Sequence, residues 1–224
     1  MKVLIADDHG LYRAGLGLLL KDRMGVSEVI ETGTLDEALD LLAHHQGIKL
    51  ALFDLSMPGM GGPESLAAVK ATYPDAYVGV ISASEDRANV LKCVSTGLSG
   101  YIPKSLSDDE IAKALELMLS GYIFVPPFMI ASTPVPSQAP AEAPRPAPVS
   151  QLETLTPRQR DVLGYILQGR SNKEIARKLD IAEGTVKIHL AALFGHFGAH
   201  NRTELATRAQ LMQNGQAVPL GREE

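Results

Sequence analysis

The stretch LALFDLSMPGM, residues 50–60, decides the fold of the N-terminal half of the chain. It begins as a short apolar run, which is typical of a strand buried on both faces of a parallel sheet. The run ends on Asp54, and a Pro-Gly loop follows at once. A single Asp in this position is most often a turn cap. In an open α/β sheet, however, ligands lie at the carboxyl ends of the strands, so Asp54 is also placed for chemistry.

Three further apolar runs end in polar side chains of complementary kinds. These ends are Asp7 and Asp8 after residues 2–6, Ser82 after residues 77–81, and Lys104 after residues 100–103. Residues 28–32 alternate like a further strand, and capping-box patterns at Thr34 and Ser107 begin two of the helical patterns that separate the strands. Strand and helix therefore alternate five times. This alternation predicts an α/β fold: a five-stranded, doubly wound parallel sheet with helices on both faces. The acids, the hydroxyl and the ammonium would then meet at one edge.

Three carboxylates at one edge repel each other and need a cation. Carboxylate oxygens without a Cys/His cluster suit a hard ion, so we expect Mg²⁺. Lys104 would add a fixed positive charge, and Ser82 would donate a hydrogen bond to an oxyanion. Such a set can hold a transferring phosphoryl group while one carboxylate acts as the nucleophile.

Composition divides the chain. Residues 1–123 contain 10 Lys/Arg and 17 Asp/Glu, whereas residues 152–217 contain 9 and 6. Residues 124–151 lie between them; eight of the 27 residues at 124–150 are Pro, which indicates a semi-rigid linker. We expect domains at 1–123 and 152–217, with a tail at 218–224. With one cysteine, no apolar run long enough for a membrane span and no signal peptide pattern, we expect a cytoplasmic protein.

The C-terminal part shows only helical patterns. Thr156 and Ser171 each begin a capping-box pattern, and a tight turn at 180–181 precedes a third helix from about residue 183. Two short helices joined by a tight turn are typical of a helix-turn-helix, and a fourth helix follows. The third helix places Val186, Leu190, Leu193 and Phe197 in one stripe, which predicts a core face. The opposite face carries Thr185, Lys187, Ile188 and Ala191.

The motifs ADDH (6–9), DLSMPGM (54–60), ISAS (81–84) and GYIPK (100–104) resemble those of the receiver domain of two-component response regulators. The motifs LTPR (155–158), SNKEIA (171–176) and GTVKIH (184–189) resemble those of the LuxR-type helix-turn-helix. The whole chain is therefore similar to the NarL/FixJ family of transcription regulators. The resemblance implies a flavodoxin-like receiver followed by an all-α, four-helix DNA-binding domain.

The resemblance also implies roles. Asp54 would accept a phosphoryl group from a sensor histidine kinase, and Lys104 would pair with that group. Ser82 would move toward it, and Tyr101 would follow inward. The implied Mg²⁺ ligands are Asp7, Asp8, Asp54 and the backbone carbonyl of Ser56. The implied DNA contacts are Thr185, Lys187, Ile188, His189, Asn172 and Lys173. The resemblance further implies RNA polymerase as a partner. It also implies a homodimer that forms on phosphorylation or DNA binding, and no membrane partner.

Several positions depart from the family pattern. Gly61 stands where Asp is frequent, Ala182 replaces a usual Ser N-cap, and Asp180 replaces a common Gly. Ala191, Gly195 and His196 stand where relatives often carry Lys or Arg. Fewer cations on the third helix predict weaker phosphate contacts.

Alternative functions are an aspartyl-phosphate hydrolase and a receiver-based interaction module without phosphotransfer. The hydrolase is disfavoured because Ser56 stands where such enzymes commonly have a second acid, so we do not expect this protein to be an enzyme. The intact Asp, Ser and Lys set disfavours the interaction module. We expect phosphorylation to pair the receivers, because the stripe Leu205, Ala209 and Met212 of the last helix should hold only a weak dimer. The competing mechanism is release of a third helix masked by the unphosphorylated receiver.

Overall fold

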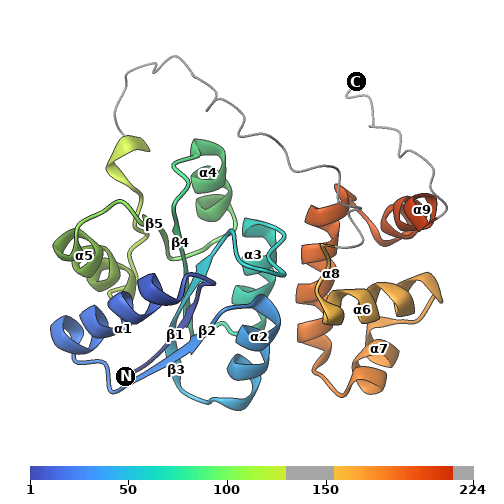
Figure 1. The fold of residues 1–224 in the computed structure, drawn as a ribbon, viewed down its shortest axis with the longest axis horizontal. Coiled ribbons are helices and arrows are strands. Elements are labelled where there is room, and N and C mark those ends of the chain that lie inside the picture. The colour runs from blue at the N-terminus through green and yellow to red at the C-terminus, as the bar shows by residue number, and fades with distance from the viewer. Residues whose placement is uncertain (130–153, 214–224) are drawn as a thin grey trace.

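The computed structural model describes residues 1–129 and 154–213, which form an α/β region and a helical region (Figure 1). The α/β region alternates strand and helix as the apolar pattern predicts. Its strands are β1 (Lys2–Ala6), β2 (Glu28–Thr32), β3 (Ile48–Asp54), β4 (Tyr77–Ser82) and β5 (Gly100–Pro103). Its helices are α1 (Gly10–Met24), α2 (Leu35–His44), α3 (Pro63–Thr72), α4 (Arg87–Ser95) and α5 (Asp108–Leu119).

The five strands form one parallel sheet in the order β2-β1-β3-β4-β5. The expected doubly wound α/β fold is therefore confirmed. The strand order reverses between β1 and β3, and the pair Ala6 and Phe53 is in register there. Asp7 and Asp54, the next residue on each strand, consequently come side by side at the carboxyl edge, where this fold class binds its ligands.

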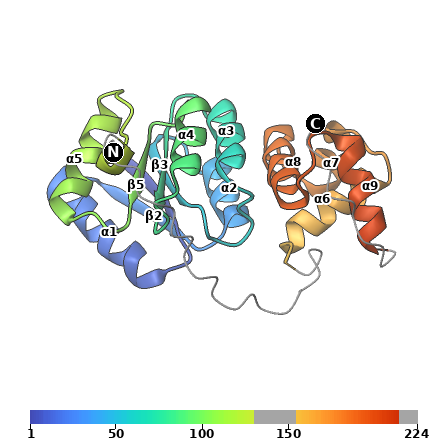
Figure 2. The ribbon, with the colours of Figure 1, turned by 90° about the horizontal axis from the view of Figure 1, so that it is seen from above.

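Helices cover both faces of the sheet (Figure 2). Helices α1 and α5 pack on one face, over a core that includes Leu20, Leu52 and Leu115. Helices α2, α3 and α4 pack on the other, over a core that includes Phe53 and Leu66. Because both faces are buried, β3 is apolar along nearly its whole length, as residues 50–53 predicted.

Helix starts follow the predicted caps with one exception. Ser107, Thr156 and Ser171 each form both halves of a capping box. The predicted box at Thr34 is wrong in one half. The Thr34 hydroxyl accepts a bond from the amide of Glu37, but the Glu37 carboxylate accepts a bond from the Thr32 hydroxyl instead of reaching back. A neighbouring strand end thus supplies a closer donor.

The predicted linker begins too early at residue 124. The Phe124 amide donates to Ser99 O and its carbonyl accepts from the Tyr101 amide, at 3.0 and 3.1 Å, which extends the sheet edge. A 3₁₀ turn follows at Pro127–Met129, and the Arg87 guanidinium donates to the carbonyls of Phe128 and Met129. Most of the Pro/Ala-rich stretch, and the tail at 218–224, lie outside the described residues.

The helical region contains α6 (Pro157–Leu167), α7 (Asn172–Leu179), α8 (Glu183–Phe197) and α9 (Arg202–Gln213). Its core is built from one side of each helix and includes Val162, Ile175, Val186 and Leu193. The predicted stripe of the third helix is confirmed: Val186, Leu193 and Phe197 are buried, and Leu190 packs against them. Asp180 adopts the left-handed conformation, φ 54°, that permits the tight turn before α8.

The stripe on the last helix does not form a free dimer surface. Leu205 and Ala209 are fully buried, and Met212 packs beside them in the core of the same domain. These residues hold α9 on its own domain, so the expectation of a weak dimer through them is wrong. None of the helices within residues 1–129 and 154–213 is long and apolar enough to cross a membrane.

Helix α8 lies beside α2 and α3 of the α/β region in both ribbon views (Figures 1 and 2). Ile188 and Ala192 of α8 belong to the same buried cluster as Phe53 and Leu66. The two regions are therefore in direct apolar contact through one face of α8.

The first prediction concerns the start of α8. Ala182 is in the extended N-cap conformation but makes no side-chain cap. Ala182→Ser should stabilise the helical domain by about 1 kcal/mol, because the hydroxyl would satisfy a free amide of the first turn. Thermal unfolding followed by circular dichroism measures this. As a control, Ala71→Ser at an exposed position in the last turn of α3, where no first-turn amide needs a cap, should give no stabilisation.

Candidate functional site

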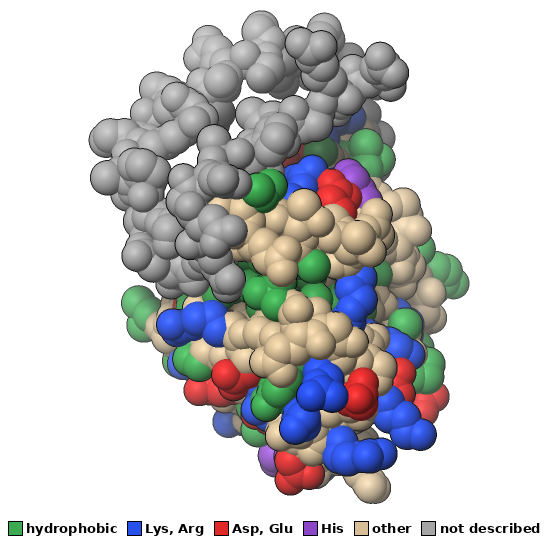
Figure 3. Space-filling view, turned by 90° about the vertical axis from the view of Figure 1, so that its right-hand side faces the viewer, with side chains coloured by type: hydrophobic (Ala, Val, Ile, Leu, Met, Phe, Trp, Pro, Cys, Tyr) green, Lys and Arg blue, Asp and Glu red, His purple; other side chains and the backbone are tan. Residues whose placement is uncertain are grey.

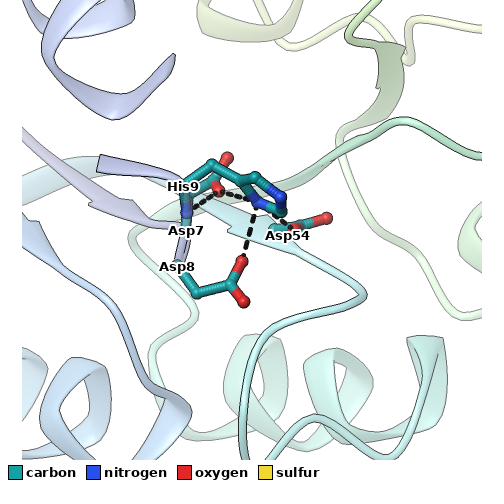
Figure 4. A group of neighbouring side chains, drawn as sticks. All are labelled: Asp7, Asp8, His9 and Asp54. Carbon is teal, nitrogen blue, oxygen red and sulfur yellow. Dashed lines mark hydrogen bonds and ion pairs between the residues drawn. The ribbon is translucent and has the colours of Figure 1, made fainter. Parts of the chain in front are cut away.

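Four polar side chains gather at the carboxyl edge of the sheet (Figure 4). Asp7, Asp8 and His9 follow β1, and Asp54 ends β3; their ligand atoms all lie within 4.8 Å of one another. Asp7 and Asp54 are 0% and 1% exposed, whereas Asp8 and His9 face solvent. The predicted meeting of the three carboxylates is therefore seen in the structure.

Lys104 supplies a positive charge to the two buried acids. Its ammonium lies 2.7 Å from Asp7 Oδ2 and 3.2 Å from Asp54 Oδ2. The backbone amide of Lys104 donates to Ser82 O at 2.7 Å, which fixes the chain as it leaves β5. The ammonium also lies 4.9 Å from the centre of the Tyr12 ring. Burial, with the Asp7 carboxylate nearby, raises the pKa of the Tyr12 hydroxyl, so Tyr12 stays neutral.

His9 belongs to this site, although the sequence analysis gave it no role beyond its place in the motif ADDH. Its Nδ1 lies 2.8 Å from Asp8, 3.3 Å from Asp7 and 3.9 Å from Asp54. Its backbone amide also donates to Asp7 Oδ1 at 2.9 Å. The signal was its place directly after Asp7 and Asp8, but a local sequence cannot show that the ring turns back over the acids.

The donor set fits a hard divalent cation. Asp54 Oδ1 is buried and has no hydrogen-bond partner among the described residues. An orphaned carboxylate oxygen beside two further carboxylates provides oxygen ligands of the kind that Mg²⁺ prefers. Ser56 follows two residues after Asp54 in an exposed loop, and the role of its carbonyl stays a prediction.

Ser82 lies on β4, the strand next to β3, and Tyr101 lies on β5, the strand beyond it. Ser82 is fully buried at the end of β4, and its hydroxyl accepts a bond from the Ser84 amide at 3.2 Å. The Tyr101 ring is also fully buried, and its hydroxyl donates to Ser84 O at 2.6 Å. The ring therefore lies inside in this conformation, and its movement on phosphorylation stays a prediction.

Helix α8 is buried on two sides. One side forms the core of its own domain, as described above. On the other side, Thr185, Ile188, His189 and Ala192 are 3%, 0%, 1% and 0% exposed. The expected exposure of Thr185 and Ile188 is wrong, because the α/β region covers them. Lys187 alone among the predicted α8 contacts is freely exposed, with Glu183 3.8 Å away.

His189 lies against α2 across this contact. Its Nδ1 is 3.6 Å from Asp36 Oδ1. Burial, reinforced by the nearby Arg158 guanidinium, lowers the pKa of His189 to about 4. Burial likewise raises the pKa of Asp36. His189 is therefore neutral at neutral pH, and the pair is not an ion pair. A neutral imidazole costs less to bury than a charged one.

Asn172 and Lys173 begin α7. Asn172 Oδ1 accepts a bond from the Arg202 guanidinium at 3.1 Å, which ties the start of α9 to α7. Lys173 is exposed, together with Arg177 and Lys178 on the same helix. Figure 3 views the molecule from the side of the helical region, and Lys and Arg side chains gather on its lower part, over α6 and α7. This part of the domain stays open to a polyanion.

Comparison with known proteins follows the same division. The response regulator receiver domain family matches residues 3–116, and the luxR family of bacterial regulatory proteins matches residues 153–209. The chain is 37% identical over 203 residues to the glycerol metabolism activator of Pseudomonas putida, which covers 91% of this chain and 92% of that protein. It is 33% identical over 204 residues to the nitrate/nitrite response regulator protein NarL of Escherichia coli K12, covering 91% and 92%.

Among solved structures, the chain is similar to a LuxR family DNA-binding response regulator from Silicibacter pomeroyi. That likeness has a TM-score of 0.50 and 30% identity, and it covers 57% of this chain and 98% of the other. A parallel-sheet domain with an acidic carboxyl edge, joined to a helix-turn-helix, defines a two-component response regulator. The chain belongs to the NarL/FixJ family of response regulators and is a DNA-binding transcription regulator of that family.

The acidic edge yields a prediction about cations. Mg²⁺ should raise the unfolding temperature of the α/β domain, because an ion bound only by the folded state stabilises it, by about 2.7 kcal/mol at about a hundred times its Kd. Thermal unfolding at constant ionic strength measures this. Asp8→Asn and Asp54→Asn should abolish the shift, whereas Asp75→Asn, an exposed acid outside the cluster, should keep it. A full shift in the Asp54→Asn protein would contradict the site.

Proposed function

We propose that Asp54 accepts a phosphoryl group from a sensor histidine kinase, and that this modification controls DNA binding by α8. The observation that carries the proposal is the position of Asp54. Its buried carboxylate lies at the switch point of the sheet, 3.2 Å from the Lys104 ammonium and beside Asp7. A carboxylate with one unpartnered oxygen, next to a fixed cation, is a suitable nucleophile for phosphoryl transfer.

The reaction is a displacement at phosphorus. An oxygen of Asp54 forms the new P–O bond as the bond from phosphorus to the kinase's histidine nitrogen breaks, and that imidazole leaves. Lys104 pairs with the charge on the phosphoryl oxygens, and the Ser82 hydroxyl donates to one of them. Asp7, Asp8, Asp54 and the Ser56 carbonyl would hold Mg²⁺, which when bound supplies the positive charge that lets an anionic donor approach.

The output is recognition of double-stranded DNA. Thr185, Lys187, Ile188 and His189 are the proposed groove contacts, and Asn172 and Lys173 are the proposed backbone contacts. In this conformation three of the four groove contacts, Thr185, Ile188 and His189, are buried against the receiver. The burial supports release of a masked helix as the activating step, in preference to receiver pairing alone.

Pairing then follows release. The apolar side of α9 is used within its own domain, so a homodimer would form through the receivers or on the DNA itself. Two copies on neighbouring half-sites would add their binding free energies and offset the few cations of α8. We propose this arrangement for the cytoplasm, with RNA polymerase as the further partner. The receiver would extend to about residue 129, and the DNA-binding domain would span 152–217.

One specific observation argues against an aspartyl-phosphate hydrolase. Such enzymes commonly place a second acid two residues after the nucleophile, and this chain has Ser56 there. An interaction module without phosphotransfer would not require the ion pairs that Lys104 makes with Asp7 and Asp54. These features support the phospho-acceptor reading over both alternatives.

We expect acetyl phosphate to label Asp54 alone, and only when Mg²⁺ is present, because three acids repel an anionic donor without a cation. Mass spectrometry of peptides from the treated protein locates the label. Asp54→Asn should remove it, and Asp75→Asn should not. Strong labelling of the Asp54→Asn protein, or full labelling in EDTA, would refute the assignment.

Masking predicts that the fragment 152–224 binds DNA more tightly than the unphosphorylated full-length chain. The gain should be about ten- to a thousandfold, because a binding-competent state populated at roughly 0.1–10% weakens apparent affinity by that factor. Both proteins are compared on one duplex at one salt concentration. In the fragment, Lys187→Ala should cost about 1–3 kcal/mol of binding if it contacts a base, with an unchanged unfolding temperature. A fragment no tighter than the unphosphorylated chain would contradict masking.

A further inference from the structure

The loop that follows Asp54 contacts both domains. We call residues 55–62, between β3 and α3, the acceptor loop. On the receiver side, Met57 is buried in the core, and Pro58 O accepts a bond from the Leu35 amide at 3.0 Å. On the other side, the Gln159 side chain of α6 donates from Nε2 to Gly59 O at 2.7 Å. One short segment therefore connects the acceptor carboxylate to the DNA-binding domain.

Gly61 of this loop makes a close interdomain approach to α8. A Cβ atom placed on Gly61 would lie 2.7 Å from Ala192 Cα of α8 and nearer still to the Ala192 carbonyl oxygen. A Cβ atom on Gly195 would overlap the Gly61 carbonyl oxygen. Real Cβ atoms do not approach other atoms so closely, so the two glycines allow backbone to meet backbone here.

Neither glycine is needed for its own backbone conformation. Gly59 and Gly62 have φ of 86° and 118°, which favour glycine in any case. Gly61 is not among the positive-φ glycines of the described residues, and Gly195 lies inside α8, where glycine weakens the helix. The interdomain approach is therefore the physical reason for glycine at both positions. It also accounts for two departures from the family pattern, one in each domain.

We propose that the acceptor loop is the direct coupling element between Asp54 and α8, and that the contact between Gly61 and Gly195 sets the strength of the closed state. The coupling role rests on the proposed function of Asp54. Phosphorylation and ion binding act at the Ser56 end of the loop. The Gly59–Gly61 end, seven residues or fewer from Asp54, then shifts against α6 and α8. Close-packed backbone contacts separate instead of deforming gradually, so a small shift opens the interface.

Alanine substitutions test the contact in the unphosphorylated full-length protein. Gly61→Ala and Gly195→Ala should each open the interface and tighten binding to a random-sequence DNA duplex by about 10- to 100-fold, because a forced methyl group strains a packed contact. The radius of gyration from small-angle scattering should rise in both. Gly15→Ala in α1 and Gly164→Ala in α6 are matched controls, since an added methyl group there meets nothing within 4 Å. Neither control should change scattering or binding.

A third variant tests the loop from the other side. In wild type, Gln159 Oε1 accepts the Thr156 amide in the capping box while Nε2 bonds Gly59 O. Gln159→Glu keeps the acceptor for the cap and replaces the donor with an oxygen that repels the Gly59 carbonyl. It should open the protein without lowering the unfolding temperature of the helical domain. A merely structural role for Gln159 would weaken DNA binding, whereas loss of the loop contact would strengthen it.

Coupling is tested by phosphorylating wild type and Gly61→Ala with acetyl phosphate, with the label on Asp54 quantified by mass spectrometry. Phosphorylation should tighten DNA binding strongly in wild type and by a much smaller factor in Gly61→Ala, which is already open. An equal factor in both proteins would overturn the coupling role. Compact scattering and unchanged binding in Gly61→Ala, Gly195→Ala and Gln159→Glu would overturn the contact itself.

The two proposals fail in different ways. If Asp54 of wild type takes no label, the proposed function falls and with it the coupling role, although Gly61→Ala would still open the protein. If Asp54 is labelled and the alanine variants stay closed, the proposed function stands and the acceptor loop is excluded as the coupling element.

Discussion

The buried charges at the carboxyl edge of the sheet constrain the rest of this protein. Two carboxylates, Asp7 and Asp54, are removed from water, and the Lys104 ammonium lies within 3.2 Å of both. Buried like charges are costly unless a cation compensates them, and one ammonium cannot neutralise three acids. The edge therefore carries unbalanced negative charge that attracts a cation. It also holds Asp54 beside Lys104, the group that would pair with a phosphoryl oxygen.

That edge is linked to the DNA-binding domain by the short segment after Asp54. The acceptor loop is held to α2 through Pro58 and to α6 through Gly59, while Gly61 meets α8. Helix α8 in turn has two buried faces, one in its own core and one against the receiver. The proposed DNA contacts Ile188 and His189 are packed against α2 and α3. DNA binding through them would therefore compete with docking on the receiver.

Most of the fold followed from local patterns because its elements are locally consistent. Apolar runs ending in Asp54 and Ser82 predicted parallel strands, and capping boxes at Ser107, Thr156 and Ser171 predicted three helix starts that the structure contains. The errors lie where a distant segment competes. Thr32 supplies the donor that draws Glu37 away from its box, and Phe124 pairs with the sheet edge at Gly100 instead of beginning the linker.

The sequence by itself determined the class of fold and the acids, hydroxyl and lysine of the candidate site, because these lie at strand ends whose convergence the parallel topology imposes. It also determined the inner stripe of α8, since a period of 3.6 residues identifies one apolar face. Only the tertiary structure decided that the other face of α8 is covered, that Tyr101 is already inside, and that His9 turns over the acids. Each of these depends on contacts between segments far apart in the chain or on a side-chain rotation. The glycines at 61 and 195 show the reason most clearly: each departs from its own local pattern, and only their meeting across the two domains explains both.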